Sequence, residues 1–224
     1  SARYKREITA SRLQLTQQLV EWMSALEVAP KRLISASAIG YYGASETSQF
    51  TESSTGGEGF SADLCQAWEV AAREATALGI PVTVLRLGVV FAKSGGALEK
   101  MTQSFRLGVE SWLGSGSQWL SWVHLTDVVR AIDHALTAAT SAPIYNVVAP
   151  HAIRHRDLAT EVGRFHRIWL KLGVPSTTAR LLAGQMAEEL LLTGQRVLPE
   201  QLEAEGFDFH YPTVADALAD LTVR

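Results

Sequence analysis

Hydrophobic residues recur along the chain in two patterns, one typical of helices and one typical of buried strands. Ile8, Leu15, Leu19 and Met23 fall near helical spacing. Spacing of this kind predicts four helices, at 4–26, 60–78, 97–107 and 126–138. Short apolar runs predict four buried strands, at 33–36, 82–87, 119–123 and 144–148. A stretch rich in Gly, Ser and Thr, from 40 to 59, is expected to be a long surface loop.

The order of these elements indicates the fold class. Short apolar strands that alternate with helices of more than about ten residues are typical of βαβ units. We therefore expect an α/β fold with a doubly wound parallel sheet and helices on both faces. After Pro150 the pattern changes, and helices are expected at 154–165, 177–192 and 214–221. We divide the chain into an α/β domain at 1–150 and a small, mostly helical C-terminal domain at 151–224.

Composition narrows the classes of partner. The chain has 224 residues, is 47% hydrophobic and carries a formal net charge of -3. No basic patch for nucleic acid or an anionic membrane is evident, so a small-molecule substrate is the expected partner. Cys65 is the only cysteine, which excludes an internal disulfide and suits a reducing compartment, so the cytoplasm is the expected location. No cluster has metal-ligand spacing, and no apolar run reaches the roughly 18 residues of a membrane span.

The segment from Ile34 to Gly43 is the most informative for chemistry. A parallel sheet binds ligands at the carboxyl ends of its strands, where the Ser37 hydroxyl is placed to hydrogen-bond a substrate oxygen. Taken alone, a serine at a strand end more often bonds to local backbone. Tyr41 and Tyr42 follow closely and offer a phenol, although loop aromatics are more commonly used for packing or for stacking on substrate.

Several motifs together carry a family resemblance. Ser35-Ala36-Ser37-Ala38 followed by Tyr42-Gly43, and the segments 84–90 and 122–128, resemble extended short-chain dehydrogenase/reductases. Segments 60–69, 95–96 and 194–199 resemble the atypical epimerase branch, whose C-terminal domain has no assigned function.

The resemblance implies a Rossmann-like domain that binds NADP or NAD, with NADP favoured. It implies an oxidoreductase related to nucleotide-sugar epimerases and dehydratases, with a substrate that the sequence does not define. On this resemblance the cofactor would be lined by Ser35, Ala36, Gly88 and Val89, and the catalytic residues would be Ser37, Tyr41 and Tyr42. The helices at 4–26 and 60–78 would pack together and form a homodimer surface, as in related proteins.

The sequence departs from the family pattern at the phosphate site. The family's G-x-x-G-x-x-G turn lies between a first strand and a first helix, where it binds the pyrophosphate. Neither Gly56-Gly57-Glu58-Gly59 nor Gly114-Ser115-Gly116 has that setting. We therefore expect the chain to be truncated at its amino end, without the first strands and the Gly-rich turn, and to bind a dinucleotide weakly by itself.

A second departure concerns the catalytic pair. Typical members place a Tyr and, four residues later, a Lys on one helix face. Aligned on Trp68-Glu69, these positions fall on Ser61 and Cys65. A neutral serine is a poor general base near pH 7, and a lone cysteine on the apolar side of a helix is usually a core residue. Two hypotheses follow: an oxidoreductase or epimerase that uses other groups, or a non-catalytic NAD(P)H-binding or sensor protein on the same fold.

Three further polar residues have structural interpretations. Arg86 ends a buried strand, and we expect it to pair with a carboxylate such as Glu52 or Glu69. His124 and Asp127 belong to the segment that resembles the family, where an Asp at a helix start caps free N–H groups. The arginine that usually grips a nucleotide-sugar diphosphate is replaced by Leu120 or Ser121, which argues against a nucleotide sugar.

Overall fold

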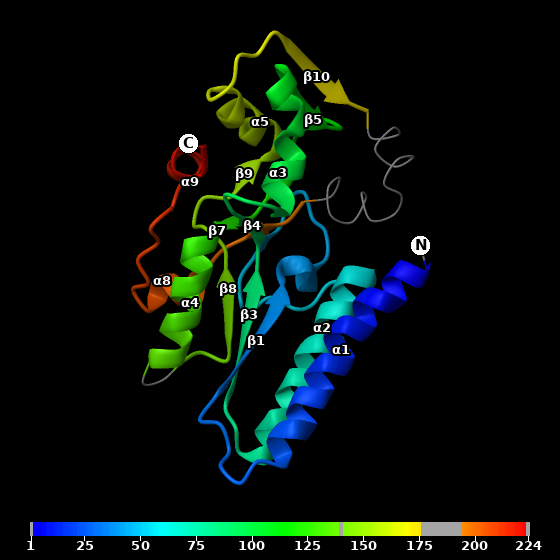
Figure 1. The fold of residues 1–224 in the computed structure, drawn as a ribbon, viewed down its shortest axis with the longest axis vertical. Coiled ribbons are helices and arrows are strands. Elements are labelled where there is room, and N and C mark those ends of the chain that lie inside the picture. Colours follow the sequence, from blue (N-terminus) through cyan, green and yellow to red (C-terminus); the bar gives the residue numbers. More distant parts are fainter. Residues whose placement is uncertain (1, 139–140, 176–193, 223–224) are drawn as a thin grey trace.

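The computed structural model describes residues 2–138, 141–175 and 194–222 (Figure 1). Its α-helices are α1 (Ala2–Ser24), α2 (Phe60–Arg73), α3 (Gly96–Thr102), α4 (Leu125–Thr137), α5 (His155–Gly163), α8 (Glu200–Ala204) and α9 (Val214–Thr222), with 3-10 helices η1 (Ile39–Tyr42), η2 (Glu74–Leu78) and η3 (Gln103–Leu107). Its strands are β1 (Leu33–Ala38), β2 (Gln49–Phe50), β3 (Val82–Leu87), β4 (Val89–Phe91), β5 (Val109–Leu113), β6 (Trp119–Leu120), β7 (Trp122–His124), β8 (Ile144–Val147), β9 (Ile153–Arg154), β10 (Leu170–Val174) and β11 (Arg196–Val197).

The central sheet is parallel and has the order β1-β3-β8. Successive side chains of β3 point to opposite faces, because a strand alternates. Val82 and Val84 pack with α1 and α2 through a cluster that includes Val20, whereas Leu85 packs with α4 through a cluster that includes Val128. Figure 1 shows α1 and α2 on one side of the sheet and α4 on the other. The expected parallel α/β fold is thus confirmed.

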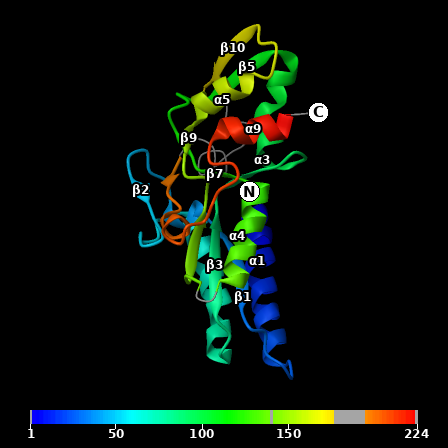
Figure 2. The same cartoon turned by 90° about the vertical axis from the view of Figure 1, so that its left-hand side faces the viewer.

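Elements α3, α5 and α9, together with β5, β9 and β10, lie beyond the carboxyl ends of the sheet strands (Figures 1 and 2). Here β5 pairs with β10 and β6 pairs with β9, while α3, α5 and α9 enclose a separate core. Trp122, Phe91 and Leu218 are among its buried residues. The strands β9, β10 and β11, which follow position 150, each pair with a strand before it, so backbone hydrogen bonds join the two segments.

The apolar run at 119–123 was expected to form one strand and forms two. Ser121 separates them, since its carbonyl accepts from the N–H of Val89 and its hydroxyl donates to the Gln195 carbonyl. The sequence pattern also missed β4, β5 and β10, which are short and half-exposed. The helix expected at 177–192 lies outside the described residues.

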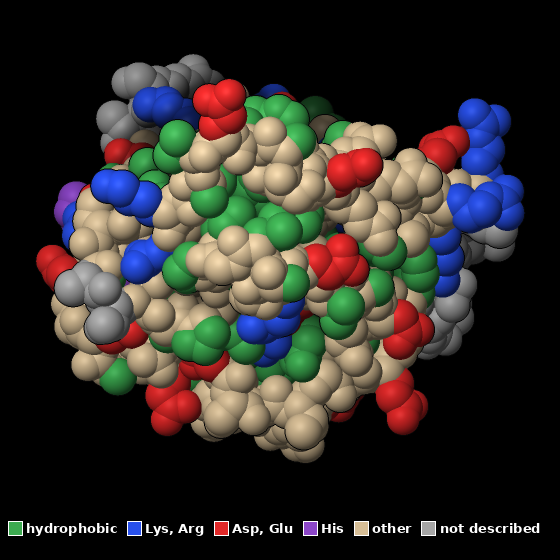
Figure 3. Space-filling model, turned by 90° about the horizontal axis from the view of Figure 1, so that it is seen from below, with side chains coloured by type: hydrophobic (Ala, Val, Ile, Leu, Met, Phe, Trp, Pro, Cys, Tyr) green, Lys and Arg blue, Asp and Glu red, His purple; other side chains and the backbone are tan. Residues whose placement is uncertain are grey.

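Side chains of both charges are spread over the surface. Viewed from below, acidic and basic groups are interspersed around a central area where hydrophobic side chains gather (Figure 3). In the ranges that the structure describes, no helix has the length and apolar character needed to cross a membrane.

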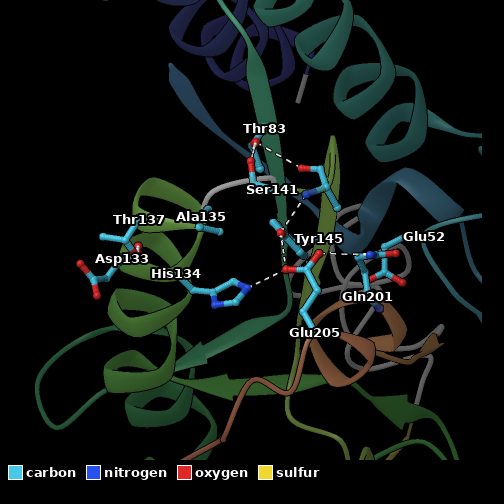
Figure 4. Close-up of polar contacts among 12 residues, drawn as sticks. Glu52, Thr83, Asp133, His134, Ala135, Thr137, Ser141, Tyr145, Gln201 and Glu205 are labelled. Atoms are coloured by element: carbon cyan, nitrogen blue, oxygen red, sulfur yellow. Dashed lines mark hydrogen bonds and ion pairs between the residues drawn. The ribbon is translucent and has the colours of Figure 1, made fainter. Parts of the chain in front are cut away.

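A polar cluster fastens α8 to the sheet and to α4 (Figure 4). The carboxylate of Glu205 accepts a hydrogen bond from the hydroxyl of Tyr145 in β8, at 2.7 Å, and lies 2.7 Å from Nε2 of His134 in α4. Gln201 in α8 also donates to Glu205. Burial would raise the pKa of Glu205, but the hydrogen bonds from His134 and Tyr145 outweigh it and lower that pKa. The segment after β11 is therefore held against the sheet by an ionised carboxylate.

Candidate functional site

The predicted catalytic residues contact a buried ion pair at the carboxyl ends of β1, β3 and β8. Ser37, Arg86 and Asn146 occupy one row across these three strands, because Ser37 pairs with Arg86 and Arg86 pairs with Asn146 in the sheet register. Tyr42 extends over the row from η1, and Glu69 reaches it from α2. The sheet register and the α2 packing together build this site.

Arg86 and Glu69 form the centre of the site. Nε and Nη2 of Arg86 donate to the two carboxylate oxygens of Glu69 at 2.8 and 2.9 Å, in a bidentate pair. The side chains are 2% and 5% exposed. Burial alone would lower the pKa of Arg86, but its bonds to Glu69 and Tyr42 raise it. The predicted pairing of Arg86 with a carboxylate is confirmed, and Glu69 rather than Glu52 is the partner.

Ser37 is tied into this ion pair. Its hydroxyl donates to Oε1 of Glu69 at 2.8 Å, and the residue is buried. A hydroxyl has one proton to donate, so in this arrangement Ser37 offers a substrate oxygen only its lone pairs. For Ser37 to polarise a substrate oxygen as predicted, its hydroxyl must rotate so that it donates its hydrogen bond to the substrate instead of to Glu69.

The two tyrosines have different environments. The hydroxyl of Tyr42 donates to Oδ1 of Asn146 at 2.7 Å and accepts from Nη1 of Arg86 at 2.9 Å. Burial raises the pKa of Tyr42 despite the opposing effect of Arg86, which makes it a weak acid at neutral pH. Tyr41 is half-buried, and the guanidinium carbon of Arg86 lies 3.4 Å from its ring centroid. Its hydroxyl makes no hydrogen bond with the part of the chain that the structure describes.

A surface of small residues lies next to this network. Ala36 is exposed and Ala38 is half-exposed on β1, and Gly88 and Val89 are half-exposed just after β3. A Cβ on Gly88 would lie 2.8 Å from the Ser121 carbonyl oxygen, so no larger residue fits there without a shift. Ser35 is buried and, because strand residues alternate, points like Ser37 to the opposite face from Ala36. Ala36 pairs with Leu85 in the sheet, and Gly88 and Val89 follow the carboxyl end of β3; we call the strand ends that carry Ala36, Gly88 and Val89 the open edge.

Ser61 and Cys65, where the resemblance leads us to expect the usual Tyr and Lys, face η1. A Cβ built on Gly40 would lie 3.3 Å from Cβ of Ser61 and 3.6 Å from Sγ of Cys65. Cys65 is buried, and burial raises the pKa of its thiol. The interpretation of Cys65 as a core residue is confirmed.

The predicted capping role of Asp127 is wrong. Nδ1 of His124 accepts from the N–H of Thr126 and caps α4. The carboxylate of Asp127 instead accepts from the backbone N–H groups of His210 and Tyr211, at 2.9 and 3.0 Å. Asp127 therefore anchors the segment before α9, because the imidazole already satisfies the helix start.

Sequence reasoning did not name Asn146, and it did not predict that Glu69 would bind Ser37 as well as Arg86. Asn146 connects the site to two other segments: its Nδ2 donates to the Leu198 carbonyl and its backbone N–H donates to Glu52. A polar residue inside the apolar run Ile144–Val147 was the available signal, since buried polar groups need partners. Among the described residues, no group of three His, Cys, Asp or Glu side chains is arranged to hold a metal ion.

Comparison with known families places both parts of the chain. Residues 1–148 match the NAD dependent epimerase/dehydratase family, and residues 174–221 match a domain of unknown function, DUF1731. The epimerase family protein SDR39U1 homolog, chloroplastic, of Arabidopsis thaliana is 38% identical over 97% of this chain and 63% of its own length. The epimerase family protein Mb2239 of Mycobacterium bovis is 37% identical over all of this chain and 74% of its own length. The chain thus spans less than two thirds of the plant relative.

Solved structures agree with the fold. The human epimerase family protein SDR39U1 (isoform 2), solved with NADPH, is 30% identical and superposes with a TM-score of 0.92 over 99% of this chain and 75% of its own. DesIV, a dTDP-glucose 4,6-dehydratase from Streptomyces venezuelae solved with NAD, superposes with a TM-score of 0.76 over 96% of this chain and 65% of its own, at 20% identity. This second likeness concerns the fold alone. The fold and the family match agree, and the chain belongs to the NAD-dependent epimerase/dehydratase family, in the branch of SDR39U1-like epimerase family proteins.

Proposed function

We propose that the protein is an NADP(H)-dependent oxidoreductase acting on a small molecule, in which this chain carries the nicotinamide side of the cofactor site and the substrate groups. The superposition of nearly the whole chain on an NADPH-bound relative, at a TM-score of 0.92, is the observation that carries the proposal. It favours NADP over NAD.

The residues at the open edge suit the nicotinamide part of the cofactor. Ala36, Gly88 and Val89 are small or apolar, are not buried, and lie in or just after the carboxyl-terminal halves of parallel strands, where such folds bind dinucleotides. A flat ring needs neighbours of this size. The sequence contains no Gly-rich strand-to-helix turn, and we assign no residue of this chain to the pyrophosphate.

When bound, the cofactor supplies or accepts hydride. Of the three predicted catalytic residues, Tyr41 has the hydroxyl that is available to exchange a proton with a substrate oxygen. Arg86 holds the Tyr41 ring by stacking on it, and Glu69 holds Arg86. Ser37 accepts a hydrogen bond from a substrate hydroxyl through its lone pairs while its own O–H continues to donate to Glu69. In this account Tyr42 positions Arg86 and Asn146.

A second candidate is a non-catalytic NADP(H)-binding or sensor protein. Ser61 and Cys65 occupy the positions of the usual Tyr and Lys, and the hydroxyls of Ser37 and Tyr42 are both committed to protein partners. Polar groups that hydrogen-bond to one another make a site rigid. A rigid site can bind a ligand without taking part in a reaction.

Turnover of NADPH with a panel of small aldehydes, ketones and keto sugars separates the two candidates. We expect Tyr41→Phe to lower the rate about a hundredfold or more, the usual contribution of a general acid. Ser61→Ala and Cys65→Ala are the matched controls and should leave the rate nearly unchanged.

Thermal unfolding of each variant is measured beside its rate, because Cys65→Ala in a core costs about 1–2 kcal/mol of stability without touching chemistry. Loss of activity in Cys65→Ala with the fold intact would replace this proposal by covalent catalysis. NADPH binding with no turnover of any compound in the panel would favour the sensor.

A further inference from the structure

An aromatic ring with two arginines lies just beyond the open edge, and the site described above does not use it. Trp119 in β6 lies opposite Arg154 in β9, whose guanidinium carbon is 3.7 Å from the ring centroid of Trp119. Arg196 in β11 approaches the same ring to 4.9 Å. All three residues are half-exposed. We call Trp119, Arg154 and Arg196 the arginine clamp.

Backbone packing fixes the clamp. A Cβ on Gly194 would lie 2.2 Å from the Trp119 carbonyl oxygen, so the segment leading into β11 rests directly on β6. The hydroxyl of Ser121 donates to the Gln195 carbonyl and accepts from the N–H of Val197, both at 2.9 Å. Arg154 is itself held by a hydrogen bond from Nη1 to the Ser117 carbonyl. Three segments far apart in the sequence therefore converge on one ring.

The two positive charges of the clamp have no carboxylate partner in the ranges that the structure describes. The guanidinium carbons of Arg154 and Arg196 are less than about 9 Å apart, since both stack on one ring, and this is about one Debye length at physiological salt. Among the described residues, no Asp or Glu forms an ion pair with either arginine, whereas Arg86 pairs with Glu69 and Lys171 pairs with Glu110. Two like charges at this distance repel, and an anion that binds to both would offset the repulsion.

The clamp is also within reach of the proposed reaction site. Ser121 follows Trp119 by two residues, or about 7 Å of strand, and its carbonyl is the group that Gly88 would contact. A small molecule that reaches Gly88 with one end can therefore reach the clamp with the other.

We propose that the arginine clamp binds a phosphate or carboxylate group, and that the substrate of this protein is a small anionic molecule. Guanidinium groups bind both kinds of oxyanion through paired N–H donors, and beyond the bond of Arg154 Nη1 to Ser117 the described residues leave those donors at the edge of the plane for an anion. The identification of the anion as substrate rests on the proposed function, whereas the anion site does not.

Titration with inorganic phosphate and, separately, with acetate tests the site in the absence of NADPH. The readout is the indole N–H resonance of Trp119, assigned with Trp119→Phe. We expect a saturable shift with at least one anion, and an affinity about tenfold lower or worse in Arg154→Gln and in Arg196→Gln, because each removes charge-assisted hydrogen bonds. Arg12→Gln is the matched control, because Arg12 in α1 also lies over the ring of a tryptophan, Trp68 in α2.

Saturation by phosphate alone or by acetate alone identifies which oxyanion the clamp takes. A shift that does not saturate with either anion, or unchanged affinity in both Gln variants, overturns the proposal. Arg196→Lys keeps the charge and is used if a Gln variant fails to fold; it should bind about threefold more weakly or worse, since the paired donors are lost. If the protein binds phosphate at the clamp but does not bind NADPH, the proposed function is wrong and the anion site still stands.

Discussion

The Arg86–Glu69 pair supports the side chains of the candidate site. A buried ion pair stabilises a fold only when both charges are fully hydrogen-bonded, and here Ser37 and Tyr42 supply the remaining bonds. The pair therefore determines where both hydroxyls lie. The sequence revealed that Arg86 needed a carboxylate, but it left Glu52 and Glu69 as alternatives, because both precede β3 and only the packing of α2 against β1 distinguishes them.

Removal of both charges should cost less stability than the sum of the two single removals. We expect Glu69→Gln to lower the free energy of unfolding by about 3–5 kcal/mol, because it leaves Arg86 buried and unpaired. The double variant Glu69→Gln with Arg86→Met should lose less than the sum of the single variants. Urea unfolding of the four proteins in the cycle measures this coupling, and strict additivity would show that the pair does not act as a unit.

His155 gives a pH-dependent prediction at the same scale. Both ring nitrogens are buried without a partner among the described residues, next to Met101 and Phe105, and burial lowers the pKa of His155 below 6.5. The unfolded chain therefore binds a proton more readily, so the stability of the folded state should fall as the pH drops below 6.5. His155→Leu should lose this part of the pH dependence.

Unfolding free energies at pH 7.5 and 5.5 test that expectation. The wild-type protein should lose more stability than His155→Leu on acidification. Equal losses in the two proteins would mean that His155 gains a partner or opens to solvent before it is protonated. Glu205 contributes in a lower window, since its pKa is lowered below 4.5 and its stabilisation is lost only as the pH falls through that lowered value.

At the scale of elements, the long and strongly patterned segments could be predicted. The strand at Val82–Leu87 and the helices α1, α2 and α4 agree with the sequence pattern within a few residues. Two-residue strands such as β6, β9 and β11 could not be predicted from the sequence, because a periodic pattern needs more residues than these strands contain. Their positions depend on contacts such as those of Ser121 and Gly194, which join segments about 70 residues apart.

The anchor of the last helix is a further test at this scale. Asp127 is fully buried, and its carboxylate accepts from two backbone N–H groups in the segment before α9. We expect Asp127→Asn to cost about 2–4 kcal/mol, because one charged acceptor is replaced by an amide that brings a donor next to those N–H groups. Hydrogen exchange should speed up most at His210 and Tyr211. Exchange that stays slow there would show that α9 is held by apolar packing alone.

At the scale of the molecule, the outer face of α1 is the strongest candidate for self-association. Leu15, Leu19 and Trp22 lie one turn apart and are 62%, 41% and 59% exposed. The predicted packing of α1 on α2 is confirmed, since Nε1 of Trp68 donates to the hydroxyl of Thr16 at 2.9 Å. We propose that this face forms a homodimer. Light scattering should detect a dimer that Trp22→Glu dissociates, and a monomer at every concentration would remove the proposal.

The candidate site was partly predictable from the sequence. Ser37, Tyr41 and Tyr42 do gather at the strand ends, because parallel strands bring their carboxyl ends to one edge. The sequence did not reveal that two of the three hydroxyls would be committed to Glu69 and Asn146. Those partners come from α2 and β8, and their approach depends on tertiary packing that local patterns do not encode.

NADPH titration followed by methyl NMR tests the central claim most directly, because it detects even weak binding and reports where it occurs. We expect saturable shifts of the Ala36 and Val89 methyl groups, at the open edge of the sheet. Val28, 83% exposed between α1 and β1, should not shift. Saturable binding that moves neither Ala36 nor Val89, or no binding at millimolar NADPH, would contradict a nicotinamide site at the ends of these strands.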